Sequence, residues 1–223
     1  MTSAAGSPLT FSALGEAAVL FDAAQGSLDF AIQQRIWALS SLLETARGVT
    51  ETVPGMNNLL VVFDPFVTDH RTVVDAANAN WPPPALPEKS GKVVEIPVVY
   101  GGRYGEDLGW MAERAGMSAE AFAGLHASAT YTVYALGGQP GFPFLGGLDP
   151  RLATPRRDVP RVHVPAGTVM IGGAQTGIYP ADAPSGWNLI GHTSVKLFDP
   201  GQMPPALLSP GDTVRMIVED VLP

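Results

Sequence analysis

A proline-rich stretch near the middle of the chain most limits how the sequence can fold. Four prolines occur within seven residues, from Trp81 to Pro87, and the polar run Glu88 to Lys92 follows. Proline cannot donate a hydrogen bond to a sheet or continue a helix, so the stretch is a connector, either between domains or inside one long loop. The patterns on its two sides differ, and 223 residues suffice for two small domains. We therefore expect one domain over residues 1–92 and a second over residues 93–223.

The first part of the chain alternates between strand and helix patterns. Its clearest helix follows Ser27 as the N-cap, with Asp29 in the first turn and an apolar stripe at helical spacing. The order of elements, β-α-β-β-α-β, is typical of a ferredoxin-like domain in an α+β protein. The predicted elements are a strand from Leu9 to Phe21 bent at Gly15, the helix with Ile32, Ile36, Leu39 and Leu43, strands Val49 to Val53 and Leu59 to Phe63, a helix capped by Thr68 that runs to about Asn78, and a strand from Val93 to Tyr100.

The remainder of the chain has a different pattern. Two short helices come first, one between Glu106-Asp107 and Gly116, the other capped by Ser118 and running to about Leu125. From Thr130 on, short strands alternate with Gly and Pro, which favours a barrel or a sandwich. These strands are Thr130 to Leu136, Val162 to Val164, Val169 to Gly172, Trp187 to Gly191 and Val214 to Val218.

Composition and charge exclude several classes of function. The formal net charge is −8 and no basic cluster is longer than Arg156-Arg157, so we expect no nucleic-acid partner. The absence of cysteine rules out disulfides, thiolate nucleophiles and zinc–thiolate sites. No apolar run approaches the roughly 20 residues that cross a bilayer, and residues 1–10 lack the features of a signal peptide. We expect a soluble, cytoplasmic protein without a membrane partner.

A glycine-rich stretch, Gly137 to Leu148, carries Phe142 and Phe144 in an otherwise flexible segment. Glycine lets the backbone approach a ligand or adopt positive φ, so the stretch is either a ligand-facing loop or a tight barrel corner with two core aromatics. It is not a phosphate loop, because no Lys-Ser or Lys-Thr follows.

Two further loops carry polar groups that can recognise a ligand. Residues 153–161 include Arg156, Arg157 and Arg161, and arginine forks suit carboxylate or phosphate, although a solvated loop has the same composition. In residues 172–180, Gln175, Thr176 and Tyr179 can read an amide or ureido group without charge, or they only satisfy the backbone of a turn.

The four histidines show no metal-ligand spacing, so no metal site is expected. A serine triad is excluded because the chain has no Gly-x-Ser-x-Gly elbow. His126 is the most interesting histidine, since it ends a helix just before a strand. The residues alone therefore assign no catalytic group and predict a polar, glycine-rich cleft.

An ordered set of segments resembles one family, whose members are variously called allophanate hydrolase subunit 1, the B subunit of 5-oxoprolinase and KipI-type kinase inhibitor. Each segment is weak alone, but together they cover most of residues 95–200 in the expected order. They are Tyr100-Gly-Gly-Arg-Tyr-Gly-Glu-Asp-Leu108, Leu125-His126, Pro140-Gly141-Phe142, Leu145-Gly-Gly-Leu148, Leu152-Ala-Thr-Pro-Arg-Arg157, Val164-Pro-Ala-Gly167, Gln175-Thr-Gly-Ile-Tyr-Pro180, Gly186-Trp187, Leu189-Ile-Gly191 and Leu197-Phe-Asp-Pro200.

The chain departs from the family pattern at two positions. The family usually reads Gly-Phe-x-Pro-Gly-Phe where this chain has Gly137 to Phe142, so an aromatic side chain is missing at Gly138. His192 stands where Arg is more usual. The first change alters a pocket wall, and the second weakens any anion site nearby.

The resemblance implies a ferredoxin-like N-terminal domain followed by a cyclophilin-like β-barrel. It also implies a subunit of an ATP-dependent 5-oxoprolinase, which hydrolyses 5-oxo-L-proline to L-glutamate. The implied partners are a chain like the A subunit of 5-oxoprolinase and a chain like its C subunit, which resembles allophanate hydrolase subunit 2. ATP would be bound by the complex, at a place that this sequence does not reveal. The alternatives are a KipI-type inhibitor of a histidine kinase and a subunit of a urea- or allophanate-related carboxyltransferase.

The best-matched loops are expected to form one concave, substrate-binding surface. We expect Gln175 there to bind a neutral lactam or ureido group, because its amide donates and accepts hydrogen bonds at once and does not titrate. The residues expected on this surface are His126, Pro140, Gly141, Phe142, Arg156, Gln175, Thr176 and Tyr179.

Overall fold

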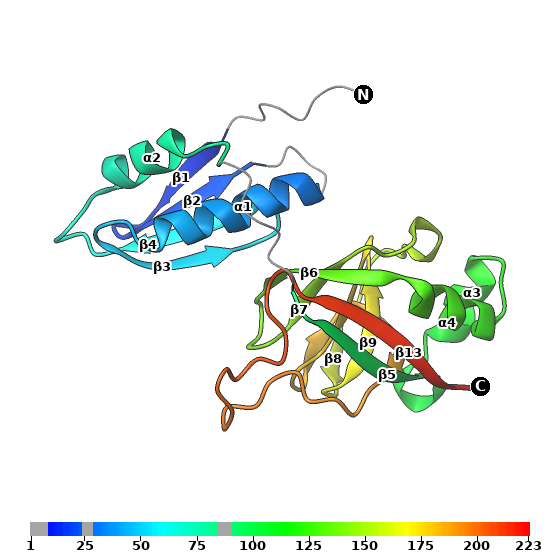
Figure 1. Cartoon of the computed structure of the whole chain (residues 1–223). Helices are drawn as coiled ribbons and strands as arrows, with labels where there is room; N and C mark the ends of the chain where they lie inside the picture. Colours follow the sequence, from blue (N-terminus) through cyan, green and yellow to red (C-terminus); the bar gives the residue numbers. More distant parts are fainter. Residues whose placement is uncertain (1–8, 24–28, 84–90) are drawn as a thin grey trace. The chain divides into compact units, whose positions relative to one another are not determined.

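The computed structural model describes residues 9–23, 29–83 and 91–223, and the chain divides into two compact units, Met1–Lys89 and Ser90–Pro223 (Figure 1). Residues 84–90 of the proline-rich connector, together with the expected N-cap Ser27, lie outside the described residues. Within the described ranges, no helix is long and apolar enough to cross a membrane.

The N-terminal unit is a four-stranded antiparallel sheet whose two helices cover one face (Figure 1). The strands lie in the order β1-β2-β4-β3. Alternate side chains of the two central strands, such as Phe21 and Val61, are buried together with apolar residues of both helices. The elements are β1 (Thr10–Leu14), β2 (Ala18–Asp22), α1 (Phe30–Leu43), β3 (Val49–Pro54), β4 (Asn58–Phe63) and α2 (His70–Ala79).

Both helices of this unit follow the sequence pattern, with caps one or two residues from those predicted. The stripe of Ile32, Ile36, Leu39 and Leu43 is buried as predicted. Asp29 itself is the N-cap of α1, because its carboxylate accepts hydrogen bonds from two backbone N–H groups of the first turn at 2.8 and 3.1 Å.

The second helix is capped by Asp69 and not by the preceding Thr68. The Asp69 carboxylate accepts the backbone N–H of Thr72 at 2.8 Å. This hydrogen bond lowers the pKa of Asp69, since the ionised form is the better acceptor.

The ferredoxin-like arrangement is not confirmed. The segment from Leu9 to Phe21 is not one bent strand but a hairpin, because Gly15 adopts φ +62° and the chain reverses over residues 15–17 to form β1 and β2. The prediction that Val93 to Tyr100 completes the N-terminal sheet is wrong. That segment is β5 (Val93–Gly101), and its Ile96, Val98 and Tyr100 side chains are buried in the core of the second unit.

The second unit is built around a closed barrel of seven strands, which is consistent with the cyclophilin-like fold that the resemblance implies. The strand order is β10-β7-β6-β13-β5-β12-β9; β5 pairs with β13 in parallel, and the other neighbours are antiparallel. Strands β8 and β11 form a separate two-stranded ribbon. The remaining elements are α3 (Leu108–Arg114), α4 (Ala119–Ser128), β6 (Thr130–Leu136), β7 (Pro143–Gly146), β8 (Arg161–Val164), β9 (Thr168–Gly172), β10 (Gln175–Ile178), β11 (Ala183–Ser185), β12 (Asn188–His192), β13 (Thr213–Leu222) and the 3-10 turns Gly102–Tyr104 and Pro150–Leu152.

A series of hydrogen-bonded polar side chains, centred on His126, lies in the barrel core. The single hydroxyl hydrogen of Thr176 is donated to the Met170 carbonyl at 3.0 Å, so its oxygen must accept the His126 Nε2–H at 2.9 Å. Nδ1 of the neutral imidazole then accepts the Tyr100 hydroxyl at 2.7 Å. Burial lowers the pKa of His126 to about 3. The neutral ring is therefore a structural part of the core.

A second apolar cluster lies on the outside of the barrel, and we call it the outer aromatic cluster. Two strand glycines make room for its rings. A Cβ atom at Gly172 would lie 2.5 Å from Cδ2 of Trp187, and one at Gly177 would lie 3.0 Å from Cζ of Phe142. The cluster consists of Phe142, Val164, Met170, Trp187 and Leu189, with Phe144 and Tyr179 packed against them.

The buried neutral imidazole makes stability depend on pH. The folded-state pKa of about 3 lies below the ordinary 6.5, so the contribution of His126 is fully present above pH 6.5 and is lost as the pH falls towards 3. Between about pH 7.5 and 5 the free energy of unfolding should fall by about 2 kcal/mol more than in His126→Gln, which cannot titrate. Urea unfolding of both proteins at each pH measures the difference, and parallel pH curves would contradict a neutral, buried His126.

Trp187 should tolerate no side chain at Gly172. Gly172→Ala should lower the free energy of unfolding by about 1–3 kcal/mol, because the new methyl group overlaps the indole. The matched control is Gly124→Ala in α4, where a Cβ atom meets nothing within 4 Å, and it should stabilise the protein by roughly 0.5–1 kcal/mol. The midpoints of urea unfolding of the two variants are compared. Equal midpoints would mean that Trp187 does not pack on β9 as described.

Candidate functional site

The eight residues expected on one concave surface fall into separate places. His126 and Thr176 are fully buried in the barrel core, so the expectation does not hold for them. The reason is the alternation along β10, where Thr176 and Ile178 point into the barrel while Gln175 and Gly177 point outward. Gln175 is half-buried and pairs with Gly172 across the β9–β10 hairpin.

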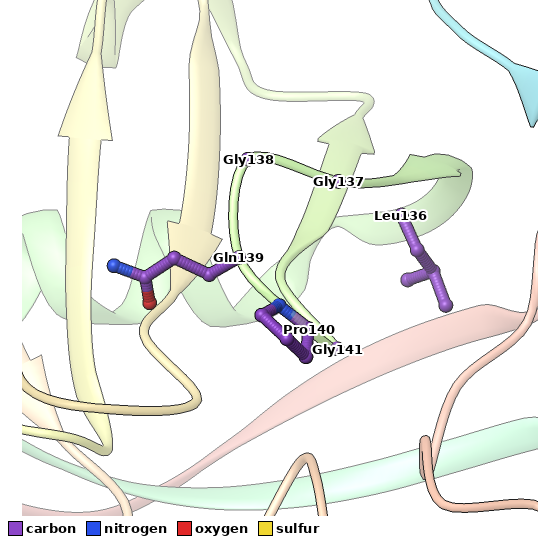
Figure 2. Close-up of a pocket in the computed structure, with 6 residues that line it drawn as sticks. All are labelled: Leu136, Gly137, Gly138, Gln139, Pro140 and Gly141. Atoms are coloured by element: carbon purple, nitrogen blue, oxygen red, sulfur yellow. The ribbon is translucent and has the colours of Figure 1, made fainter.

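Pro140 and Gly141 lie in the glycine-rich turn between β6 and β7. This turn lines a depression of about 340 Å³. Figure 2 shows the residues that line it, with the Gln139 side chain directed away from that of Leu136. Gly141 adopts φ +79°, and a Cβ atom there would lie 2.8 Å from Cβ of Phe198. Gly138, where the family usually has an aromatic, faces open space. None of the residues that line the depression is charged. At Gly138 no side chain extends its wall.

Phe142, Tyr179 and Arg156 are brought together by the outer aromatic cluster. The Phe142 ring centroid lies 5.6 Å from that of Tyr179 and 6.0 Å from that of Trp187. The guanidinium carbon of Arg156 lies 5.5 Å from the Trp187 centroid, a cation–π distance that holds the arginine against the cluster. The glycine-rich stretch was expected to be either a ligand-facing loop or a tight barrel corner with packed aromatics. Phe142 fits the second alternative, because its ring is packed in the outer aromatic cluster.

A second depression lies where the arginine-rich loop meets α3, and we call it the arginine depression. It has a volume of about 450 Å³. Three arginines and one aspartate supply its charged groups, and one tryptophan supplies an aromatic wall. Its lining residues are Trp110, Arg114, Pro155, Arg156, Arg157, Asp158, Val159 and Asn188.

Asp107 holds this region together. It immediately precedes α3 and is buried, yet its carboxylate does not cap the helix. Oδ2 accepts the backbone N–H of Leu189 at 2.7 Å, and Oδ1 accepts Nε1–H of Trp110 at 3.1 Å. Oδ1 also accepts hydrogen bonds from Arg161 at 3.0 Å and Arg157 at 3.3 Å.

Asp107 stays ionised although it is buried. Burial raises the pKa of this carboxyl, but hydrogen bonds from Arg161, the Leu189 backbone and Trp110 outweigh burial and hold the pKa below its ordinary value. The carboxylate therefore fixes α3 and β12 on one side and two arginines of the loop on the other.

The backbone of the arginine-rich loop is fixed as well. Thr154 and Gly173 exchange two backbone hydrogen bonds of 3.0 and 2.7 Å. Nδ2 of Asn188 donates to the Pro155 carbonyl at 2.9 Å, and the Arg157 N–H donates to the Gly186 carbonyl at 2.7 Å. The loop backbone is therefore held in one conformation by these hydrogen bonds. The alternative of a merely solvated loop does not apply to its backbone.

Four residues of this region were not predicted as functional: Asp107, Trp110, Arg114 and Asn188. Asp107 stands in a segment matched to the family, but the sequence indicated only the start of a helix. Trp110 and Arg114 follow at helical spacing on an exposed surface, which is a weak signal without the loop that faces them. Within residues 9–23, 29–83 and 91–223, no group of three or more His, Cys, Asp or Glu side chains could hold a metal ion.

Comparison with known sequences identifies one family along nearly the whole chain. The family model for the carboxyltransferase domain, subdomain C and D, matches residues 9–208. The B subunit of 5-oxoprolinase from Escherichia coli O157:H7 is 45% identical over 204 residues, which are 92% of this chain and 93% of that protein. The corresponding B subunit from Haemophilus influenzae is 46% identical over 189 residues, 85% of this chain and 88% of that protein.

Solved structures show the same fold both in a chain of similar length and inside longer chains. TTHA0988 is 37% identical with a TM-score of 0.81 over 93% of this chain, which spans only 42% of that protein. PH0987 from Pyrococcus horikoshii is 35% identical over 95% of this chain and 98% of its own, with a TM-score of 0.57. The K. lactis urea amidolyase, 23% identical with a TM-score of 0.79, shares the fold over 15% of its length. The chain therefore belongs to the family of carboxyltransferase subdomain C and D proteins, of which the B subunit of 5-oxoprolinase is a member.

Proposed function

We propose that this chain is a subunit of an ATP-dependent 5-oxoprolinase and is active only in a complex with two other chains, one like the A subunit and one like the C subunit of that enzyme. The observation that carries the proposal is the identity of 45–46% to two 5-oxoprolinase B subunits over 88–93% of their length. The reaction would open the lactam of 5-oxo-L-proline by hydrolysis to L-glutamate.

The need for partners is supported by the size of the relatives. TTHA0988 and the K. lactis urea carboxylase contain this fold in 42% and 22% of their chains, so the fold occurs joined to further protein. Modules that are joined in one chain commonly share an interface when they occur as separate chains. The partner we expect is a chain resembling allophanate hydrolase subunit 2, also called the C subunit of 5-oxoprolinase.

ATP would supply a phosphoryl group to the amide oxygen, which makes the lactam carbonyl carbon electrophilic. The glycine-rich turn of this chain does not fit the nucleotide, because its depression carries no cationic side chain and the turn leads into β7 and not into a helix. We therefore assign to this chain the binding and orientation of the organic substrate.

The matched family is described as a carboxyltransferase domain, which favours one alternative, a subunit of a urea- or allophanate-related carboxyltransferase. The likeness to the K. lactis enzymes supports only the fold, since the identity is 21–23%. A biotinylated protein in the native complex would support this alternative, whereas ATP-dependent release of L-glutamate from 5-oxo-L-proline would support the oxoprolinase.

The partnership is tested by co-expression. This chain and a chain like the C subunit should elute together in size-exclusion chromatography at micromolar concentration, because each is expected to leave an interface open when alone. Adding a chain like the A subunit should then give ATP-dependent hydrolysis of 5-oxo-L-proline. Separate elution of two well-folded chains would contradict the proposed complex.

Gln175 should contribute to binding the lactam within that complex. Loss of one hydrogen bond between neutral groups costs roughly 0.5–1.5 kcal/mol and more if a partner is left unpaired, so Gln175→Ala should lower activity by about 3- to 30-fold without dissociating the complex. Gln175→Glu should lower it further, because a second carboxylate would face that of the substrate. Unchanged kinetics with a lowered melting temperature for Gln175→Ala would show that the residue only supports its hairpin.

A further inference from the structure

We propose that the arginine depression binds the carboxylate of a small cyclic substrate, with Arg114 and Arg156 as the groups that take it. The identity of this ligand as 5-oxo-L-proline rests on the proposed function; the preference for a carboxylate rests on the depression itself. Trp110 and Arg114 of α3 would thus take part in substrate binding together with Arg156.

The charge of the depression differs from that of the chain. The protein carries a formal net charge of −8, yet three arginines and only one carboxylate, Asp158, line this depression. Among the described residues, Arg114 and Arg156 form no ion pair with a carboxylate. Two guanidinium groups are thus left to bind an anion, and their planar forks suit a carboxylate with two parallel hydrogen bonds.

The depression is already shaped in the free chain. Asp107 accepts hydrogen bonds from both Trp110 and Arg157, so the two sides of the depression are attached to one buried carboxylate. Arg156 packs against the Trp187 ring. The backbone of the arginine-rich loop next to it is fixed by the hydrogen bond from Asn188 to the Pro155 carbonyl. A binding group that is held in place beforehand loses less conformational entropy when the ligand arrives.

The size and lining suit a ring that carries one carboxylate. A volume of about 450 Å³ lies within the usual range for small-molecule sites, roughly 300–1,000 Å³. Trp110 is 41% exposed, so its indole offers apolar contact to a small ring. The exposed face of Trp110 would contact the ring of a cyclic carboxylate, whereas inorganic phosphate has no ring to place there, which is why we commit to the carboxylate.

The test measures binding to the full chain by isothermal titration calorimetry. The probes are L-5-oxoproline, 2-pyrrolidinone, which has the same lactam without the carboxylate, and inorganic phosphate. L-5-Oxoproline should bind wild-type protein about tenfold or more tightly than either other probe, since a hydrogen bond to a charged group contributes about 1.5–3 kcal/mol. Tighter binding of phosphate than of L-5-oxoproline, weakened by the arginine variants below, would overturn the carboxylate assignment.

Three variants locate the binding. Arg114→Gln and Arg156→Gln should each weaken L-5-oxoproline binding by about 3- to 30-fold and bring it close to that of 2-pyrrolidinone. Arg114→Lys, which keeps the charge but lacks the fork, should fall between wild type and Arg114→Gln. The control is Arg71→Gln on α2, whose exposed side chain pairs with Asp75 and which should bind as wild type does. Wild-type affinity in both glutamine variants would overturn the proposal.

The reconstituted complex separates this inference from the proposed function. An active complex in which the two glutamine variants leave KM for 5-oxo-L-proline unchanged would overturn the arginine depression and leave the oxoprolinase standing. A wild-type complex without ATP-dependent hydrolysis would overturn the oxoprolinase, while calorimetry on the full chain still decides whether the depression takes a carboxylate. If wild-type chain binds none of the probes and KM does not respond to the variants, the depression is not a binding site.

Discussion

The buried carboxylate of Asp107 is the interaction on which the candidate site depends. An ionised group in a protein interior is tolerated only when hydrogen bonds and opposite charge replace the water that it has lost. Asp107 obtains these from Leu189 in β12, Trp110 in α3, Arg157 in the arginine-rich loop and Arg161 at the start of β8. Satisfying one charge therefore brings four segments of the second unit to one place.

The two polar centres of the barrel unit show opposite solutions to burial. His126 stays neutral, and its two ring nitrogens are used up by Tyr100 and Thr176 inside the barrel. Asp107 stays charged and accepts hydrogen bonds from Arg157, which lines the arginine depression, and from Arg161. A neutral, saturated centre has no capacity left for a ligand, whereas the charged centre leaves Arg156 and Arg114 with free donors beside it. The difference explains why the candidate site is sought outside the barrel wall.

Much of the fold could be predicted because its signals are local. The stripe of α1 and the strand Thr130 to Leu136 follow from spacing alone, and the structure confirms both. The placement of Val93 to Tyr100 could not be predicted, since a strand pattern does not tell which sheet the strand joins. For the site, segments matched to the family pointed to Phe142, Arg156 and Tyr179, which do come together. Thr176 was misplaced because one residue of register separates the inside of a barrel from its outside.

The parallel pair of β5 and β13 has a consequence for the order in which the molecule is made. These neighbouring strands are separated by more than a hundred residues of sequence, so the barrel wall stays open until residues 213–222 have been synthesised. Contacts within residues 1–89, by comparison, are complete much earlier during translation. The N-terminal unit can thus form while the ribosome is still synthesising the barrel. Until β13 has been synthesised, the apolar strands of the unfinished barrel are exposed and can aggregate with other chains.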